Sequence, residues 1–437
     1  MRIGRTLPPT AAHIPWRNFL HGLAAVALKQ RYLKKFAREL KAYFGVRHVF
    51  LVSSGKAGLY ITLKALQKLN GQKTRVLVPA YTCFSVPSAI VKAGLSVSLC
   101  DINPTTLDFD YELLEQELTE ETLCVIPNHL FGIPSDVQRV KDLCASRGIF
   151  VLEDAAQSMG ERHKGSWLGT IGDAGVFSLG RGKNLSCGSG GIVITNSDPI
   201  GQAIAEQYSA LLAPGLISNV IALLKACLLR LFLHPSLYWF PSNLRFLKLG
   251  ETIFYKDFPV HRLHATGAAL VGGWQRQLQA LNRVRARNAD DFCRRLGWRA
   301  SRNGSIPYLR LPFLTMDGEF RTRLYELCVR QGLGISMMYP TGIHEIEELK
   351  RQFAGMSFPS ASSVASRLLA IPTHHLVNEE DKEAICALLE ESGASQSFEA
   401  IGHRSAGEET SLQGWPNLHG ARVALHGHPD WHSRPAG

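Results

Sequence analysis

Short apolar runs alternate with amphipathic stretches through the first half of the chain. The runs are rich in Val, Ile and Leu and are bounded by Gly, Pro or polar residues, which is typical of strands buried on both faces. They predict strands over residues 49–52, 76–78, 95–100, 123–127, 149–152, 176–179 and 191–195. Apolar residues at helical spacing predict helices over residues 56–69, 85–93 and 135–147. This alternation predicts an α/β fold with a mostly parallel sheet.

The pattern changes near residue 214. A strongly apolar segment, 216–233, carries Lys225 and Arg230 and is followed by Pro235. Further on, a long helix over 262–296 is interrupted at Gly272-Gly273. Apolar runs at 307–311 and 337–339 and helices at 320–331 and 379–391 complete the pattern, which predicts a smaller α+β domain.

We therefore expect four parts. They are an N-terminal arm (1–30), a large domain (31–260) with an apolar insertion at about 214–255, a small C-terminal domain (261–392) and a tail (393–437). The tail is rich in Gly, Ser, His and Pro and has no apolar periodicity, which is typical of disorder.

Composition is that of an ordinary globular enzyme, with 45% hydrophobic and 19% charged residues in 437. The nine cysteines are scattered singly and form no C-x-x-C pair, which argues against a disulfide framework or a metal site and favours reduced thiols in the cytoplasm. Prolines stand where a secretory signal would need an apolar core, so no signal is expected.

The net charge of +11 includes a basic run at residues 29–38. This run is either a solvated helix face or a surface that attracts an anion, such as a nucleotide diphosphate or an anionic membrane. No nucleic-acid module stands out, so DNA and RNA are not expected partners.

The apolar insertion leaves three alternatives open. Residues 216–249 would form a helix buried in a dimer interface, lie peripherally in a membrane interface, or cover a lipid-linked substrate. Two charges and Pro235 weaken the interpretation as a membrane-spanning helix.

Two residues carry the strongest chemical signal. Asp154 ends an apolar strand, at the sheet edge where ligands gather, and Lys183 follows, with Gly180 and Gly182 before it and Gly188 after it. A lone lysine is usually a surface charge, and a lone aspartate after a strand is usually a helix cap. Here they occur together with a third element, the strand-to-helix turn at 53–58, whose free N–H groups suit an anion. An amine for an aldehyde, a carboxylate for a ring nitrogen and donors for a phosphate are what pyridoxal 5′-phosphate (PLP) requires.

The sequence resembles the DegT/DnrJ/StrS family of PLP-dependent sugar aminotransferases, which have the fold-type I (aspartate aminotransferase-like) architecture. The matching stretches cover roughly residues 30–390 apart from the insertion: 53–59, 78–82, 100–104, 126–132, 153–157, 172–178, 183–184, 190–191 and 339–341. The resemblance implies a seven-stranded, mostly parallel sheet in the large domain and an α+β C-terminal domain.

It also implies roles for individual residues. Lys183 would hold PLP as a Schiff base and move protons, Asp154 would pair with the pyridine nitrogen, and Gln157 would contact the ring hydroxyl side. The phosphate would be bound by Lys56, Ala57 and Ser178, and the ring would be stacked by Cys83 or Phe84. The candidate substrate contacts are His129, Arg181, Tyr339 and His344.

The implied function is transfer of an amino group from an amino acid, usually glutamate, to a nucleotide- or lipid-linked keto-sugar in glycan or secondary-metabolite biosynthesis. The implied assembly is a homodimer whose active sites borrow groups from the second subunit. Two alternatives stay open: another PLP reaction on the same fold, or a regulatory protein on a degenerate one. A sugar dehydratase of this family is expected to lack the lysine, whereas Lys183 is present.

Four positions depart from the family pattern. Cys83 stands at the usual aromatic stacking position, Arg181 lies where a His and a Pro are frequent, and Ser189 replaces a common Glu. The usual Asn-Tyr-Arg motif of the partner-subunit loop reads Val260-His-Arg. These departures affect the prediction of the substrate more than the prediction of the cofactor.

Overall fold

The computed structural model describes residues 4–244, 252–298, 306–393 and 401, which lie in one compact unit within residues 1–404. Almost all of the predicted tail and residues 245–251 of the predicted insertion lie outside the described residues. The division into a large and a small domain stays a prediction.

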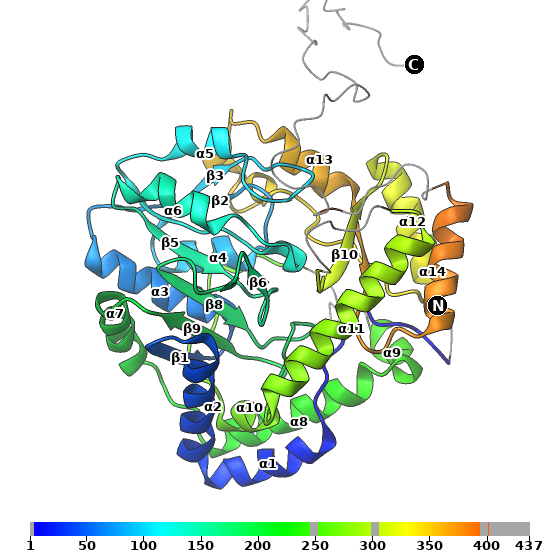
Figure 1. The fold of residues 1–437 in the computed structure, drawn as a ribbon, viewed down its shortest axis with the longest axis horizontal. Coiled ribbons are helices and arrows are strands. Elements are labelled where there is room, and N and C mark those ends of the chain that lie inside the picture. Colours follow the sequence, from blue (N-terminus) through cyan, green and yellow to red (C-terminus); the bar gives the residue numbers. More distant parts are fainter. Residues whose placement is uncertain (1–3, 245–251, 299–305, 394–400, 402–437) are drawn as a thin grey trace, which may run out of the picture. The chain divides into compact units, whose positions relative to one another are not determined.

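A seven-stranded sheet forms the centre of this unit (Figure 1). Its strands are β1 (His48–Val52), β2 (Arg75–Pro79), β3 (Ser96–Cys100), β4 (Thr122–Val125), β5 (Phe150–Asp154), β8 (Ala174–Ser178) and β9 (Gly191–Thr195). The order is β1-β9-β8-β5-β4-β2-β3, and only β9 runs against its neighbours. The predicted mostly parallel sheet is therefore confirmed, and all seven predicted strands belong to it.

Helices cover both faces of the sheet. They are α3 (Gly55–Leu69), α4 (Ser85–Lys92), α5 (Tyr111–Glu117), α6 (Val137–Ala145) and α7 (Asp198–Ser209). Alternate residues of β2 divide between two clusters: Val76 and Val78 pack with α3 and α4, and Leu77 packs with α5 and α6. Burial on both faces explains the continuous apolar runs in the sequence.

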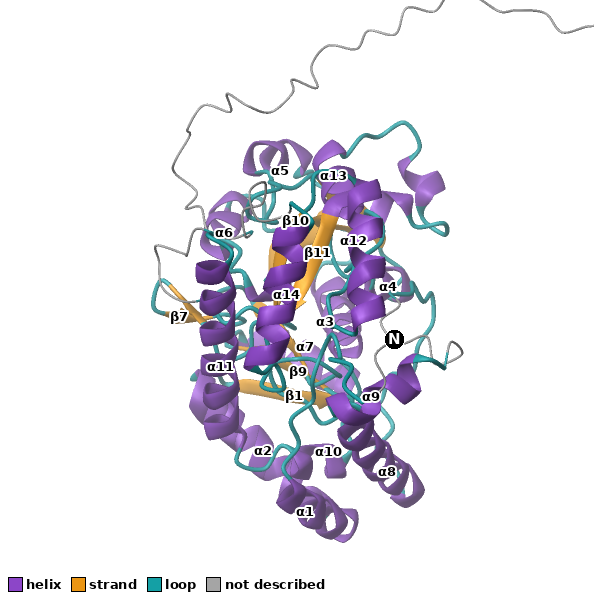
Figure 2. Cartoon of the chain, turned by 90° about the vertical axis from the view of Figure 1, so that its right-hand side faces the viewer, coloured by secondary structure: helices purple, strands orange, loops and turns teal. Residues whose placement is uncertain are grey.

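The second half of the chain adds a smaller sheet and more helices (Figure 2). Strands β10 (Arg310–Leu314) and β11 (Leu368–Pro372) pair antiparallel. The helices are α10 (Ala265–Leu270), α11 (Trp274–Arg295), α12 (Gly318–Gln331), α13 (Pro359–Arg367) and α14 (Glu379–Glu391). Short elements are β6 (Arg162–His163), β7 (Ser166–Trp167), η1 (Leu130–Gly132), η3 (Ile343–Glu345) and η4 (Lys350–Phe353). The predicted break at Gly272-Gly273 is confirmed, because Gly273 has φ of 72° and separates α10 from α11.

Helices gather at one end of the unit, below β1 in Figure 1. They include α1 (Trp16–Ala27), α2 (Lys29–Phe44) and α8 (Leu216–Phe232), and α9 (Pro235–Ser242) continues from α8 toward the right-hand side of the view. Helix α1 packs on α10 and α8, and the Arg230 guanidinium lies 4.8 Å from the Trp16 ring centre. Within the described residues, no single helix is long and apolar enough to cross a membrane, whereas α8 and α9 together meet that test but are bent by 109°.

The N-terminal segment is held to the C-terminal part by His374. Its Nε2 donates to the Pro8 carbonyl at 2.8 Å, and burial lowers the pKa of His374 to about 4. In the unfolded chain His374 takes up a proton near pH 6.5, whereas in the folded chain it stays neutral down to about pH 4. The free energy of unfolding therefore falls as the pH drops from about 6.5 to about 4. We expect the wild type to lose about 3 kcal/mol over this range from His374 alone, and His374→Gln to reduce that loss, in urea titrations at a series of pH values. An unchanged pH dependence in His374→Gln would contradict this assignment.

Candidate active site

The predicted site residues converge at one edge of the central sheet. Asp154 is the last residue of β5, and Ser178 is the last residue of the parallel neighbour β8. Helix α3 begins just after β1, with Ser54 as its N-cap. The carboxyl ends of parallel strands form the edge where ligands bind in open α/β sheets, so the strand order itself creates the site.

Asp154 is buried and held in a fixed orientation. One carboxylate oxygen accepts from Asn128 Nδ2 at 2.7 Å and the other from the Ala156 N–H at 3.1 Å. Asn128 also donates to Thr82 Oγ1 at 2.7 Å, which fixes the amide. Burial raises the pKa of Asp154, and the charge of Lys183 opposes this rise. A cationic group beside Asp154 would therefore stabilise its ionised form.

Lys183 lies in the loop between β8 and β9. Burial lowers its pKa, the charges of Cys83 and Asp154 partly offset this effect, and Arg310 adds to it. The loop backbone is fixed, because Arg285 donates to the Lys183 carbonyl at 3.2 Å. A lowered pKa makes more of the amine neutral, which is the form that attacks a carbonyl.

The first turn of α3 and Ser178 form a cradle for an anion. A Cβ on Gly55 would lie 3.1 Å from Ser178 Cβ, so a larger residue would push the helix and β8 apart by a few tenths of an ångström. The N–H groups of Gly55 and Lys56 have no acceptor among the described residues, and the helix dipole favours an anion there. The Ala57 N–H donates to Ser54 Oγ at 3.1 Å, and the predicted contact of Ala57 with a phosphate stays a prediction.

The Lys56 ammonium packs against two aromatic rings. Its ammonium lies 4.5 Å from the Tyr255 ring centre and 4.8 Å from that of Phe258. Burial lowers the pKa of Lys56. The Lys56 backbone N–H is therefore the group that the structure offers to an anion.

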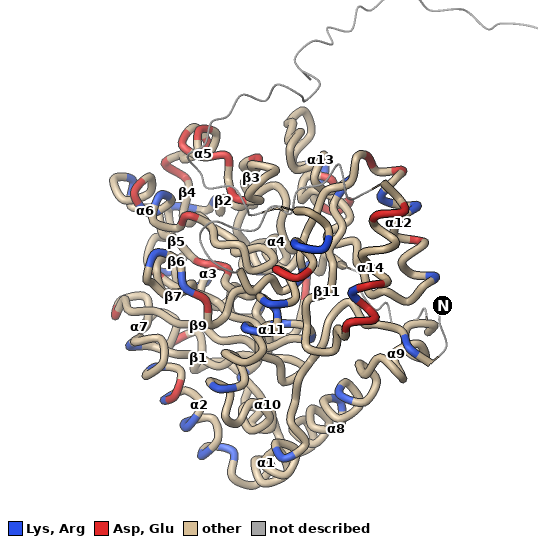
Figure 3. The backbone as a smooth tube through the Cα atoms, turned by 45° about the vertical axis from the view of Figure 1, so that its right-hand side comes forward, with Lys and Arg blue, Asp and Glu red and all other residues tan. Residues whose placement is uncertain are grey.

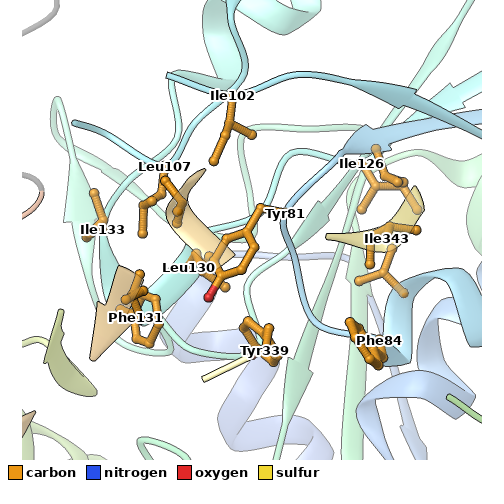
Figure 4. Close-up of a cluster of buried hydrophobic side chains, with 14 of the residues drawn as sticks. Tyr81, Phe84, Ile102, Leu107, Ile126, Leu130, Phe131, Ile133, Tyr339 and Ile343 are labelled. Atoms are coloured by element: carbon orange, nitrogen blue, oxygen red, sulfur yellow. The ribbon is translucent and has the colours of Figure 1, made fainter. Parts of the chain in front are cut away.

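Tyr339 forms an aromatic wall with its neighbours (Figure 4). It accepts from Gln157 Nε2 at 3.1 Å, and Gln157 Oε1 accepts from the Phe131 N–H at 3.2 Å. Burial and the adjacent Cys83 thiol raise the pKa of Tyr339 well above its ordinary value. Phe84 stacks on Tyr339, with ring centres 6.5 Å apart, and is buried, whereas Cys83 is partly exposed. Cys83 is therefore better placed than Phe84 to face a ligand.

Two predicted substrate histidines make hydrogen bonds to other protein groups. His129 is fully buried: its Nδ1 accepts from the Ser135 N–H at 3.1 Å, so Nε2 carries the proton and donates to Glu153 at 3.0 Å. Both ring nitrogens of His129 are engaged inside the protein, and its predicted substrate contact stays a prediction. His344 pairs with Ser362 Oγ at 3.0 Å, and within the described residues it makes no hydrogen bond to Asp154 or Lys183.

Arg181, another predicted substrate contact, is exposed. It lines an apolar groove beside the site, together with Ser189.

The structure also brings in residues that sequence reasoning missed. Asn128 orients Asp154, and its place directly after a predicted strand was the available signal. Arg310 Nε donates to the Pro9 carbonyl at 3.0 Å. The charge of Arg310 lowers the pKa of Lys183 and partly offsets the rise in the pKa of Tyr339. An arginine inside the apolar run 307–311 could have indicated a site role for it.

Glu153, the residue before Asp154, binds several buried donors, and its removal should destabilise the fold. Its buried carboxylate accepts from His129 and from the N–H groups of Gly169, Ile171 and Gly172 at 2.7, 2.5 and 2.6 Å. Glu153→Ala leaves these donors unpaired, and we expect the free energy of unfolding to fall by about 3–5 kcal/mol. Urea titration measures this, with the exposed Glu115→Ala expected within about 0.5 kcal/mol of wild type. Equal stability of the two variants would refute the supporting role.

Comparison with known proteins agrees with this geometry. Residues 25–218 match the model of the DegT/DnrJ/EryC1/StrS aminotransferase family. This part of the chain is similar to that family. The family resemblance inferred from the sequence motifs is thereby confirmed.

A relative from Escherichia coli O157:H7, "GDP-perosamine synthase", is 32% identical over 193 residues, or 42% of this chain and 52% of that protein. The chain thus matches about half the length of such curated relatives. The fold is that of Helicobacter pylori PseC (TM-score 0.72, 16% identity, 89% of this chain and 99% of that one). It is also that of an E. coli GDP-4-keto-6-deoxy-D-mannose-3-dehydratase (TM-score 0.70, 18% identity, 89% and 100%).

Proposed function

We propose that this protein is a PLP-dependent aminotransferase of the family matched by residues 25–218, and that it acts on a keto-sugar. The observation that carries the proposal is the convergence at one sheet edge of three groups: the Lys183 amine with its lowered pKa, the buried carboxylate of Asp154 and the α3 cradle with Ser178. This donor set fits the cofactor, because it offers an amine, a partner for a ring nitrogen and unpaired N–H groups for a phosphate. The dehydratase of the same fold is described with bound hydrated PLP.

Each residue has a defined task in this proposal. When bound, PLP supplies an electron sink for the substrate carbon. Asp154 would hold a proton on the ring nitrogen, and Lys183 would bind the cofactor and move a proton at its Nζ atom. Gln157 and Tyr339 would wall one side of the ring, and Arg310 would keep the Lys183 amine neutral by its charge.

An amino acid, with glutamate as the first candidate, would supply the amino group, and a keto-sugar would receive it. Two relatives support this assignment by name: the E. coli protein called "GDP-perosamine synthase" and PseC, described as an "aminotransferase involved in the biosynthesis of pseudoaminic acid". The same names favour a role in glycan biosynthesis.

The donor reaction gives the direct test of this function. PLP-loaded protein is mixed with glutamate without any acceptor, and 2-oxoglutarate is measured. We expect close to one 2-oxoglutarate per cofactor, because the amino group stays on the cofactor until an acceptor arrives. If glutamate, glutamine and aspartate all give no keto acid, aminotransfer is refuted and another PLP reaction on this fold takes its place.

We further propose that the protein works as a cytoplasmic homodimer that rests on an anionic membrane through α1, α8 and α9. These helices expose large apolar side chains, among them Leu20 (71% exposed) and Ile217 (74%). Residues 1–38 contain eight Lys or Arg and residues 207–250 contain four, and neither segment contains Asp or Glu. Figure 3 shows basic positions but no acidic ones along α8. Apolar side chains with exclusively basic neighbours suit the interface of an anionic bilayer.

Vesicle flotation tests this membrane contact. We expect the protein to float with vesicles of phosphatidylglycerol and phosphatidylcholine, and less with phosphatidylcholine alone. The double variant Leu20→Glu/Ile217→Glu should stay in solution. An equal fraction of floating protein with and without the anionic lipid, and in the wild type and the double variant, would refute the proposal.

A further inference from the structure

A groove of about 1370 Å³ runs between α8, α9 and the loop that carries the candidate catalytic lysine. Its walls are mostly aliphatic and aromatic, with side chains from α8 such as Ile221, Leu229 and Phe232. Its polar groups include Arg181, Ser189 and Lys225. A groove that is apolar along its length and carries cations fits an elongated ligand with a hydrocarbon chain and an anionic head.

The groove is continuous with the active-site loop. A Cβ on Gly188 would lie 3.7 Å from Leu229 Cδ2, so α8 lies close to the loop that contains Lys183. Arg181, two residues before Lys183, lines the groove. Tyr238 from α9 also lines it and is buried within electrostatic reach of both Arg181 and Arg310. The charge of Arg310 also lowers the pKa of Lys183. Tyr238 and Arg310 therefore connect the groove to the Lys183 amine.

We propose that this groove binds the hydrocarbon chain of a lipid-linked sugar phosphate, with the anionic link near Arg181 and Lys225. The inference rests on the proposed function and names the class of its acceptor: a keto-sugar carried on a long-chain lipid phosphate or diphosphate. The chain would lie along α8, and the sugar would extend toward Lys183.

Charge favours a lipid over a second copy of the chain in this groove. Arg181 and Lys225 are exposed and have no ion-pair partner among the described residues. A two-fold contact through α8 would bring these cations against their own copies, and residues 207–250 contain no carboxylate to separate them. A phosphate group supplies the missing negative charge.

Equilibrium dialysis of the full-length protein with labelled farnesyl diphosphate tests the proposal. We expect saturable binding that excess inorganic pyrophosphate does not displace, because the hydrocarbon chain contributes most of the affinity. Ala222→Trp places a ring in the groove and should weaken binding at least tenfold. Val220→Trp adds the same ring on α8 at a position that does not line the groove, and should stay within twofold of wild type.

Three results would overturn the proposal. They are binding that pyrophosphate abolishes, equal affinity of the two tryptophan variants, and loss of a dimer in Ala222→Trp with unchanged binding of the probe. The last result would assign the groove to a second copy of the chain. The dialysis needs no cofactor and no turnover, so its failure is distinct from failure of the donor reaction with glutamate.

Discussion

Replacing Lys183 with alanine should abolish the visible absorbance of the PLP-loaded protein and lower the rate of 2-oxoglutarate formation from glutamate by at least about 10³-fold. Lys183 is the amine that the loop after β8 brings to the buried carboxylate of Asp154, and its pKa is lowered by burial. The variant loses both the covalent attachment point and the proton carrier. Absorbance spectra and a coupled assay for 2-oxoglutarate measure the two effects.

The exposed Lys41→Ala variant is the matched control, since it removes a lysine charge from α2 and should keep the spectrum and the rate. A Lys183→Ala protein that still yields the wild-type band on addition of PLP would place the reactive amine elsewhere.

Asp154→Asn should produce the second largest effect. The substitution keeps the size of the side chain but removes the charge that would hold a proton on the cofactor ring. We expect the rate of 2-oxoglutarate formation to fall by about 10²–10³-fold, the range found when one fixed electrostatic partner of a transition state is removed.

A pH profile separates this role from a merely structural one. The Asp154 charge raises the pKa of Lys183, so its loss should lower that pKa further. The rate at which the unloaded protein takes up PLP should therefore reach its half-maximum at a lower pH in Asp154→Asn than in the wild type. An unchanged profile, or one moved to higher pH, would contradict direct coupling of the two groups.

The sequence predicted the sheet well because every strand is buried on both faces and reads as an uninterrupted apolar run. It also located Asp154 and Ser178, because the ends of parallel strands are visible in the pattern. Gln157 and Tyr339 were identified through the family motifs, and the structure brings them together at 3.1 Å.

What the sequence could not predict depends on contacts between distant segments. His129 lies in a family-like motif, and only the structure shows that Glu153 and Ser135 engage both its ring nitrogens. The ammonium of Lys56 is drawn to Tyr255 and Phe258, some 200 residues away. The groove along α8 exists only because α8 and α9 lie beside the Lys183 loop, which neither periodicity nor composition indicates.

The most direct test of the account is to find where PLP attaches. The protein is incubated with PLP, reduced with borohydride, digested with trypsin and analysed by mass spectrometry. The account predicts that the peptide containing Lys183 gains the mass of a reduced phosphopyridoxyl group, while Lys56 and the surface lysines remain unmodified. Stoichiometric labelling of any other lysine, or no labelling at all under saturating PLP, would contradict it.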